Sequence, residues 1–248
     1  MHYVNHSFIV LLAGLLILSA LPSRADYNTA HSAFLNGDYA VALKKFKEDG
    51  GAQSCFKLGT MYDNALGVEE DKKEALKWYL KAAEQGLDAA QHRIGEMYDN
   101  GRGVPENSRE AVKWYRKAAE QGYAIASFKL GDMYYNGRGV QKDLAEGIKW
   151  FHQSARVGNM KAQYELANLY YLGKDSSGKA FTKDRTEAAR LYLRSAEQGH
   201  IKAQYAIASM YLRGEGVAVN REESMKWMRK AAENGHKRAQ AELRGVVK

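Results

Sequence analysis

Three glycine-rich segments have the composition of a phosphate-binding loop. The sequence is Gly-Arg-Gly-Val at residues 101–104 and 137–140, and Gly-Glu-Gly-Val at residues 214–217. A nucleotide-binding loop follows a strand and offers free backbone amides to a phosphate at the start of a helix. No strand-like segment precedes these glycines, no Gly-Lys-Ser/Thr follows them, and capping residues already use the amides of the next helix. We therefore interpret the segments as tight turns between helices.

Two Ser-x-x-Lys sequences match a motif of penicillin-interacting enzymes, in which the serine is acylated. They are Ser54 with Lys57 and Ser176 with Lys179. A working site also needs Ser-Asp-Asn and Lys-Thr-Gly elements, which place the acyl group and protonate the leaving amine. The sequence contains neither element. Ser54 also stands where alanine stands 36 positions later, so we expect it to pack in a core, and we predict no enzymatic activity.

Metal-binding residues are scarce. The seven histidines include no His-x-x-x-His pair, and Cys55 is the single cysteine. One cysteine cannot form an intramolecular disulfide, and it cannot build a structural zinc site of the cysteine type. We predict no metal site and no cofactor.

The elements that carry these residues repeat along the chain. Corresponding residues recur at intervals of 36, with one interval of 41 that reflects five extra residues within Gly173 to Phe181. We predict a loop there, because the register resumes after it. Internal periods of this length are typical of solenoid repeats. The periodic residues are Tyr62, Tyr98, Tyr134, Tyr170 and Tyr211; Trp78, Trp114, Trp150, Leu191 and Trp227; and Gly86, Gly122, Gly158, Gly199 and Gly235.

Each unit has the pattern of two antiparallel helices. The first helix carries apolar and small residues at helical spacing, as at Ala126, Leu130, Gly131 and Tyr134, and ends at a glycine that can adopt the left-handed conformation. The second helix begins with a capping box, in which a capping side chain and a glutamate three residues later each bond the other's backbone amide. The five boxes are Asp71 with Glu74, Asn107 with Glu110, Asp143 with Glu146, Asp184 with Glu187, and Asn220 with Glu223.

The second helices predict how the units pack. Small residues flank the Trp position, as Ala111, Ala118 and Ala119 flank Trp114. We expect neighbouring helices to approach closely at the alanines while the tryptophan ring fills the space beside them. One helix pair cannot bury its apolar face alone, so the units should stack into an all-α solenoid with capping units at both ends.

The repeat resembles a known family. The segment ASFKLGDMYYNGRGVQKDLAEGIKWF at residues 126–151, and KAAEQG at residues 81–86 and 117–122, resemble the Sel1-like repeat, a relative of the tetratricopeptide repeat. The resemblance covers roughly residues 51–243. It implies an α/α superhelix whose first helices line the concave face. It also implies adaptor work, in which proteins and, in some bacterial members, envelope polymers or host factors are bound. Some cysteine-rich members were described as penicillin-binding or β-lactamase-like, but this chain lacks their paired cysteines.

The repeat register predicts the division of the chain. A signal peptide comes first, followed by a capping helix pair, five repeats and a C-terminal capping half-repeat. The predicted bounds are 1–25 for the signal, 26–51 for the first cap, 52–235 for the repeats (52–87, 88–123, 124–159, 160–199 and 200–235) and 236–248 for the last cap.

The N-terminus has the features of an export signal. Residues 8–21 form an apolar run too short for a membrane span, and Ser23 and Ala25 place small residues at the −3 and −1 positions of a cleavage site. We predict cleavage between Ala25 and Asp26, and hence a periplasmic or secreted protein with no stable membrane span. Because no Lys or Arg precedes the apolar run, an uncleaved anchor is the open alternative.

The charge of the chain restricts its partners. The formal net charge is +8, and the basic residues are spread along the sequence rather than gathered in one block. This distribution does not predict nucleic-acid binding. An anionic partner, such as an acidic protein or an anionic envelope polymer, fits the mild basic excess.

Positions that vary between repeats are the candidates for partner binding. Lys57, Arg93 and Lys129 occupy one such position, and the charge changes sign in the fourth repeat. If the first helices line the concave face, these three side chains form a basic stripe there. Tyr135 and Tyr171 occupy a second variable position, at which the other repeats carry different residues.

The sequence is compatible with three functions. The leading hypothesis is an exported, non-enzymatic scaffold that binds a protein partner through its concave face. The alternative is a binder or regulator of an envelope polysaccharide or peptidoglycan, which a Tyr-rich and basic surface favours. The third is a β-lactamase-like hydrolase, for which only the Ser-x-x-Lys sequences argue.

Overall fold

The computed structural model describes residues 24–175 and 178–246, and these residues form thirteen α-helices. Within the described ranges, extended pairing is limited to one bridge between Lys174 and Ala180. The helices are α1 (Arg24–Leu35), α2 (Tyr39–Asp49), α3 (Ala52–Asp63), α4 (Lys72–Glu84), α5 (Asp88–Asn100), α6 (Ser108–Glu120), α7 (Ala124–Asn136), α8 (Leu144–Arg156), α9 (Met160–Leu172), α10 (Arg185–Glu197), α11 (Ile201–Arg213), α12 (Arg221–Glu233) and α13 (Lys237–Val246).

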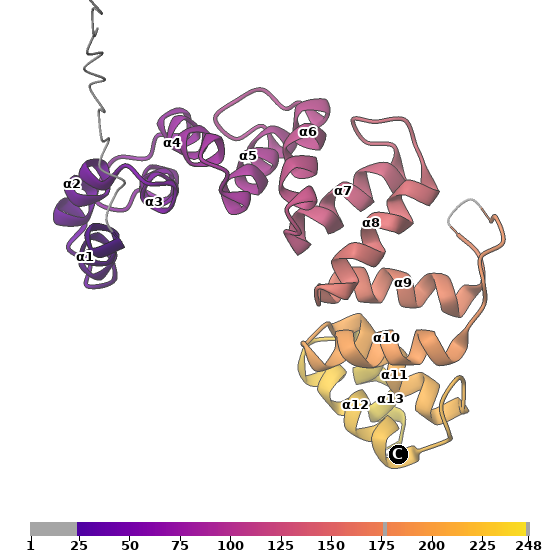
Figure 1. Cartoon of the computed structure of the whole chain (residues 1–248). Coiled ribbons are helices and arrows are strands. Elements are labelled where there is room, and N and C mark those ends of the chain that lie inside the picture. Colours follow the sequence, from indigo (N-terminus) through magenta and orange to yellow (C-terminus); the bar gives the residue numbers. More distant parts are fainter. Residues whose placement is uncertain (1–23, 176–177, 247–248) are drawn as a thin grey trace, which may run out of the picture.

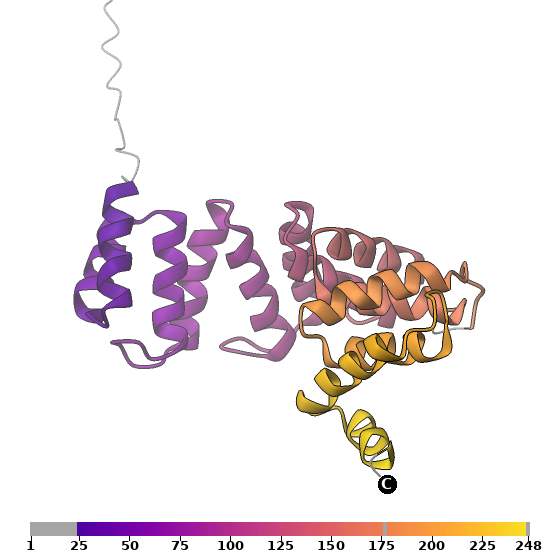
Figure 2. The same cartoon turned by 90° about the horizontal axis from the view of Figure 1, so that it is seen from below.

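Consecutive helices pack into pairs, and the pairs stack in chain order (Figure 1). The array bends into an arc, with α3 and α5 towards the inside of the bend and α4 and α6 towards the outside (Figure 1). Figure 2 shows the indigo and purple helices standing upright and the orange helices lying across the view, so the helix direction rotates along the array. These observations confirm the predicted all-α solenoid, with α1 and α2 before the repeats and α13 after them.

The second helix of every repeat starts at the predicted capping residue, but only half of each capping box forms. The Asp71 carboxylate accepts bonds from the amides of Lys73 and Glu74, both at 2.9 Å, and the other four caps bond the amide of their glutamate. The reciprocal bond is absent because the Asp71 amide donates to the Tyr62 carbonyl at 3.0 Å. Glu74 instead pairs with Lys77 one turn later, at 2.7 Å. The same two contacts replace the reciprocal bond in all five repeats. The backbone bond ties the start of each second helix to the first helix of its own pair.

The first helices end as predicted where glycine is present. Gly101 terminates α5 in the left-handed conformation, with φ of 65°, and its amide donates to the carbonyl of Met97. The corresponding residue after α3 is Ala65, which has φ of 56° and is the single non-glycine residue with positive φ in the described part of the chain. An alanine in this region costs backbone energy that glycine avoids.

In the first four repeats, the residue after the Trp position is an aromatic side chain buried in the core. Tyr115 is fully buried, and a Cβ added to Gly95 of the facing helix would lie 2.7 Å from its ring. Gly59 and Tyr79 are in the same relation, at 2.6 Å. The neighbouring tryptophan, Trp114, packs against a core that α4 of the preceding repeat shares with α5 of its own repeat. The second helices α4, α6 and α8 therefore carry two successive aromatic residues, whereas α10 has Leu191 at the first of these positions and α12 has Met228 at the second.

The glycine-rich segments are turns, as predicted, and they also lie against the preceding repeat. A Cβ on Gly216 would come within 2.0 Å of the Arg185 carbonyl oxygen at the start of α10. The valine that follows, Val217, packs against the core. A side chain at this glycine would separate consecutive repeats, so the turn requires glycine.

The predicted signal peptide falls mostly outside the described residues, which begin at Arg24. The predicted cleavage point between Ala25 and Asp26 lies in the first turn of α1. In the described ranges, no helix combines the length and apolar character needed to cross a bilayer.

Candidate partner-binding surface

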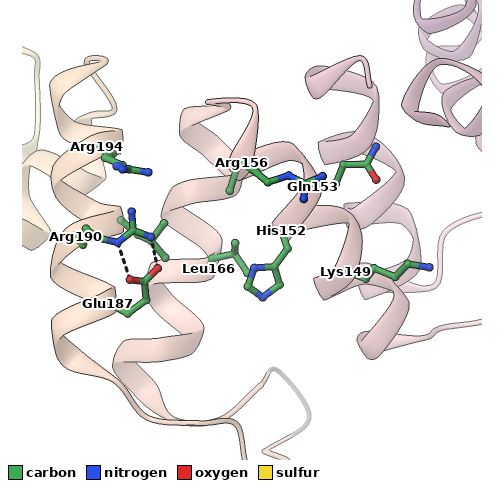
Figure 3. Close-up of a pocket in the computed structure, with 10 residues that line it drawn as sticks. Lys149, His152, Gln153, Arg156, Leu166, Glu187, Arg190 and Arg194 are labelled. Atoms are coloured by element: carbon green, nitrogen blue, oxygen red, sulfur yellow. Dashed lines mark hydrogen bonds and ion pairs between the residues drawn. The ribbon is translucent and has the colours of Figure 1, made fainter. Parts of the chain in front are cut away.

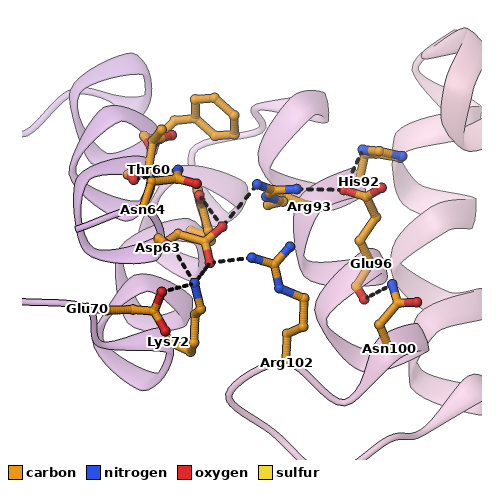
Figure 4. A network of polar contacts seen from close by, with 12 residues as sticks. Thr60, Asp63, Asn64, Glu70, Lys72, His92, Arg93, Glu96, Asn100 and Arg102 are labelled. Carbon is orange, nitrogen blue, oxygen red and sulfur yellow. Dashed lines mark hydrogen bonds and ion pairs between the residues drawn. The ribbon is translucent and has the colours of Figure 1, made fainter. Parts of the chain in front are cut away.

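The side chain of Asp63 is fully buried and is surrounded by cations (Figure 4). Its carboxylate lies 3.0 Å from the Arg93 guanidinium, 3.0 Å from the Arg102 guanidinium and 3.2 Å from the Lys72 ammonium. The Tyr79 hydroxyl donates to the same carboxylate at 3.4 Å. Arg93 and Arg102 belong to the following repeat, so this cluster joins two consecutive repeats. A buried carboxylate needs such partners, because an unpaired charge away from water is strongly unfavourable.

The same relation recurs one repeat further along. The Arg138 guanidinium lies 3.0 Å from the carboxylate of Asp99 and 3.1 Å from that of Asp132. Arg102 and Arg138 are the middle residues of the Gly-Arg-Gly turns, and each pairs with the aspartate that lies 39 residues earlier. The two turns therefore have a structural task beyond reversing the chain: they clamp the second repeat to the first and the third repeat to the second.

In the last two repeats the clamp has a different chemistry. The turn residue is Glu215, and the partner in the preceding repeat is Tyr171, whose hydroxyl donates to the Glu215 carboxylate at 2.8 Å. Arg213 also bonds this carboxylate, at 3.1 Å, and the Arg185 guanidinium lies 5.5 Å from the centre of the Tyr171 ring. Tyr171, a predicted partner-binding residue, thus has a hydroxyl that is engaged within the fold.

The three residues of the predicted basic stripe have unequal environments. Arg93 is held by Asp63 and also by Glu96, at 3.0 Å. The Lys57 ammonium lies 5.3 Å from the centre of the Phe34 ring. Lys129 is half-buried and forms no ion pair with any described residue. The stripe is therefore not a row of three equivalent cations, and Arg93 has a structural role that the spacing alone did not reveal.

The first helices of the last three repeats, together with α13, line a groove. Three hollows of about 430, 400 and 310 Å³ lie over α7, α9, α11 and α13, and they share lining residues: Tyr164 lines the first two, Asn168 the first and third, and Glu165 the second and third. We call this continuous surface the first-helix groove. Its aromatic and basic lining residues are Tyr135, Tyr164, Tyr171, Tyr192, Tyr205, Phe128, Phe151, Lys161, Lys174, Lys202, Arg213, His200, His236 and Arg238.

Glu165 stands at the centre of the groove. Burial raises the pKa of its carboxyl group, as does the charge of Asp132, whereas the hydrogen bond with Asn168 and the charge of Lys202 lower it. The amide of Asn168 lies 3.4 Å from the Glu165 carboxylate, and its oxygen accepts a bond from the Tyr192 hydroxyl at 2.5 Å. The groove thus combines hydrogen-bonding groups of both kinds with tyrosine rings.

Two histidines cap helices at the wall of the groove. The Nδ1 atom of His200 accepts the amide of Ala203 at 3.3 Å, and that of His236 accepts the amide of Ala239 at 3.2 Å. His200 packs on the Tyr164 ring, with centroids 4.5 Å apart, and His236 stacks on a tyrosine of the repeat before it. An accepting Nδ1 requires a neutral ring. Burial lowers the pKa of both imidazoles, in keeping with that state.

The two predicted tyrosines both line the first-helix groove. Tyr135 borders the 310 Å³ hollow together with Glu165, and its ring lies 5.7 Å from that of Phe151. Tyr171 borders the 430 Å³ hollow. The structure therefore brings these tyrosines to one surface, whereas Lys57, Arg93 and Lys129 line none of its hollows.

Ser54 and Cys55, which carry nucleophilic side chains, are both buried in α3. Ser54 has an exposed fraction of 0% in α3, and Ser176 lies outside the described residues. Cys55 is buried, its thiol donates to the Gly50 carbonyl at 3.4 Å, and burial raises its pKa. Among the described side chains, no three His, Cys, Asp or Glu residues lie close enough together to hold a metal ion.

Stacked helix pairs, joined by clamps between repeats, define the chain as an α-solenoid repeat protein. The family model described as the Sel1 repeat matches residues 52–87, 88–123, 124–159, 161–200 and 201–236. The chain belongs to the Sel1 repeat family, whose solenoids are a type of protein-interaction scaffold.

Solved structures show the same fold. A Sel1 repeat protein from Oxalobacter formigenes is 32% identical, with a TM-score of 0.76, over 91% of this chain and 89% of that one. A protective antigen from uropathogenic Escherichia coli strains is 36% identical, also with a TM-score of 0.76, over 90% of this chain and 48% of its own length. An immunity protein from Pseudomonas aeruginosa shares the fold at 20% identity and a TM-score of 0.53, over 84% and 82% of the two chains. No curated protein matches the chain.

Proposed function

We propose that this protein is an exported, non-enzymatic scaffold that binds a protein partner in the first-helix groove. The observation that carries the proposal is the groove itself: connected hollows, lined by tyrosine rings and by charged groups of both signs, on a scaffold of rigid helices. Tyrosine offers a large contact area at a small cost in side-chain entropy, and it is enriched in protein interfaces.

The residues that differ between repeats support this location. Tyr135, Glu165 and Asn168 stand at repeat positions whose side chains change along the chain, and all three line the groove. The repeated residues, in contrast, form the cores and the caps. A scaffold that uses its constant positions for the fold can use its variable positions for recognition.

The choice of test residues follows from their partners within the fold. Lys161 and Lys202 line the 400 Å³ hollow, are exposed, and form no ion pair with any described residue. Lys161→Glu with Lys202→Glu therefore changes the charge of the groove, including the charge near Glu165, without breaking an ion pair between described residues. Arg93 is unsuitable for this purpose, because its removal would expose the buried Asp63 charge.

The experiment is a quantitative capture of proteins from an extracytoplasmic extract of a native host. The unchanged chain, the double variant in the groove, and a control with Lys47→Glu and Lys73→Glu serve as baits. The control makes the same charge change at exposed, unpaired positions of α2 and α4. We expect one protein to be retained by the unchanged chain and the control, and its recovery to fall at least about fivefold with the groove variant.

Other outcomes identify the competing functions. Equal retention by all three baits would remove the groove from the proposal. Retention of isolated cell-wall material, without a retained protein, would favour the polysaccharide function. A covalent adduct with a labelled penicillin would revive the hydrolase function, although burial of Ser54 opposes it.

The export part of the proposal has a separate test. The sequence of the first 25 residues supports a cleaved signal, and cleavage there would leave α1 starting at Asp26. The mass of the protein recovered from the periplasm or medium of an expressing bacterium measures the cleavage point directly. A retained N-terminal segment would indicate an anchor instead.

A further inference from the structure

The second helices of the third and fourth repeats are separated by a basic groove that shares no residue with the first-helix groove. This cavity of about 480 Å³ lies between α8 and α10, and we call it the interhelix cavity (Figure 3). Figure 3 shows Glu187, Arg190 and Arg194 on one helix, His152 and Gln153 on the other, and Leu166 of α9 between them. The remaining lining residues are Lys149, Ala155, Arg156 and Leu191.

The cavity coincides with the one repeat that lacks the tryptophan of the second helix. Trp114 and Trp150 each pack in a core that the preceding second helix shares with the first helix of their own repeat, and Leu191 stands at the same position in the fourth repeat. Leucine is smaller than tryptophan and is buried against the core. The space that the indole fills elsewhere is therefore part of the cavity.

Because the ring is missing, one cationic side chain also lacks the aromatic neighbour that it has in other repeats. The ammonium groups of Lys81, Lys117 and Lys230 lie 4.2, 4.1 and 4.7 Å from the rings of the tryptophans three residues earlier. Arg194 holds the same repeat position but has Leu191 in place of a ring. It forms no ion pair with any described residue, and its side chain is exposed at the cavity.

A second departure from the repeat pattern adds another cation. Arg156 stands where the other four repeats carry glutamate, namely Glu84, Glu120, Glu197 and Glu233. It lines the cavity and, like Arg194, forms no ion pair within the described part of the chain. Of the other charged lining residues, Arg190 pairs with Glu187 through its Nε atom at 2.7 Å, and Lys149 pairs with Glu146 at 3.3 Å. Two guanidinium groups therefore face the cavity without an acidic partner.

We propose that the interhelix cavity binds an acidic peptide segment whose aromatic side chain occupies the space of the missing tryptophan. The apolar part of the cavity, Ala155, Leu166 and Leu191, receives the ring, and the free guanidinium groups of Arg156 and Arg194 pair with carboxylates beside it. Guanidinium groups suit this task because they bind carboxylates through two parallel hydrogen bonds. This site lies beyond the proposed function, because it uses second helices and a different surface.

The test is isothermal titration calorimetry of the full chain with three blocked peptides. Glu-Asp-Trp-Asp-Glu carries both features, Gln-Asn-Trp-Asn-Gln removes the charges, and Glu-Asp-Ala-Asp-Glu removes the ring. We expect the first peptide to bind at least about tenfold more tightly than either of the others. No binding of the first peptide, or equal binding of all three, would overturn the proposal.

Two protein variants assign the binding to this cavity. Leu191→Trp restores the residue of the other repeats and fills the space, and Arg156→Glu with Arg194→Glu removes both free cations. Each is expected to weaken binding of the first peptide at least about tenfold. The control, Lys117→Glu with Lys230→Glu, makes the same charge change on other second helices and should leave the affinity within about threefold. If the control weakens binding as much as the cavity variants, the binding is general charge attraction and the proposal is wrong. The charge variant keeps the test decisive should Leu191→Trp fail to fold.

Discussion

The guanidinium of Arg102 lies 3.0 Å from the carboxylate of Asp63, a fully buried side chain 39 residues earlier and one repeat before it. This contact passes from a turn of one repeat to a helix of the previous one. The first three repeats are thus held together by paired charges as well as by apolar packing.

Removal of the buried carboxylate should therefore weaken the array. Asp63→Ala leaves Lys72, Arg93 and Arg102 without their shared partner, and we expect the free energy of unfolding to fall by about 3 kcal/mol. Urea unfolding followed by circular dichroism measures this change. Glu74→Gln removes an exposed pair with Lys77 and serves as the control, with little expected change. Equal stability of both variants would show that the Asp63 cluster does not stabilise the fold.

The close contact between α5 and α6 predicts the effect of a single methyl group. Gly95→Ala places a Cβ 2.7 Å from the buried Tyr115 ring, so the helices must separate, at a cost of about 1–3 kcal/mol. The fourth repeat has Ala167 at this position, with Tyr192 facing it. There the reverse change, Ala167→Gly, should lower stability by about 1 kcal/mol, because glycine is the poorer helix former. The melting temperature measures both changes, and it should fall in both variants. A Gly95→Ala variant with an unchanged melting temperature would contradict the close-contact interpretation.

The conformation of Ala65 predicts a stabilising substitution. Its φ of 56° is unfavourable for alanine and ordinary for glycine, which holds this position after α5. Ala65→Gly should raise the free energy of unfolding by up to about 1 kcal/mol. Gly101→Ala, the opposite change in the next repeat, should lower it by a similar amount. A melting temperature that falls in Ala65→Gly would show that the alanine is not strained.

The histidines predict a loss of stability on mild acidification. Burial lowers the pKa of His92, His152, His200 and His236 in the folded chain. The unfolded chain therefore binds protons first as the pH falls. The stabilisation is present above the unfolded pKa of about 6.5 and is lost as the pH falls through that value towards the lower pKa of the folded state.

Substitution of the two capping histidines isolates their part in this effect. Asparagine can cap a helix but does not titrate, so His200→Asn with His236→Asn should reduce the fall in melting temperature between pH 7.5 and pH 5. The unchanged chain, measured in the same buffers, is the reference. An identical fall in both proteins would assign the acid sensitivity to other groups.

Features set by residues close in sequence could be predicted from the sequence. The helix pairs, the starts of the second helices and the glycine ends of the first helices follow from capping residues and periodicity. The prediction failed where contacts between helices intervene. The Asp71 amide bonds a carbonyl of the first helix of its own pair, so the capping box is incomplete.

The binding surfaces were harder to predict, because they depend on how repeats stack. Tyr135 and Tyr171 do line the first-helix groove. Arg93, in contrast, forms an ion pair with Asp63 of the preceding repeat, and this contact depends on how the two repeats stack. The constant spacing of Asp63 from Arg102 and of Asp99 from Arg138 was a signal for these clamps. Leu191 and Arg156 also differ from the residues at the same positions of the other repeats, and this difference can be seen in the sequence. The cavity that they line depends on the spacing of α8 and α10, which the sequence does not give.

Site-specific photocrosslinking can show whether a protein partner occupies the first-helix groove. The crosslinking residue p-benzoylphenylalanine replaces Lys202 in the groove or, as the control, Lys73 on α4, and the full chain is irradiated in its native host. We expect one crosslinked polypeptide from position 202 and none from position 73. Equal crosslinking from both positions, or none from position 202, would contradict this expectation.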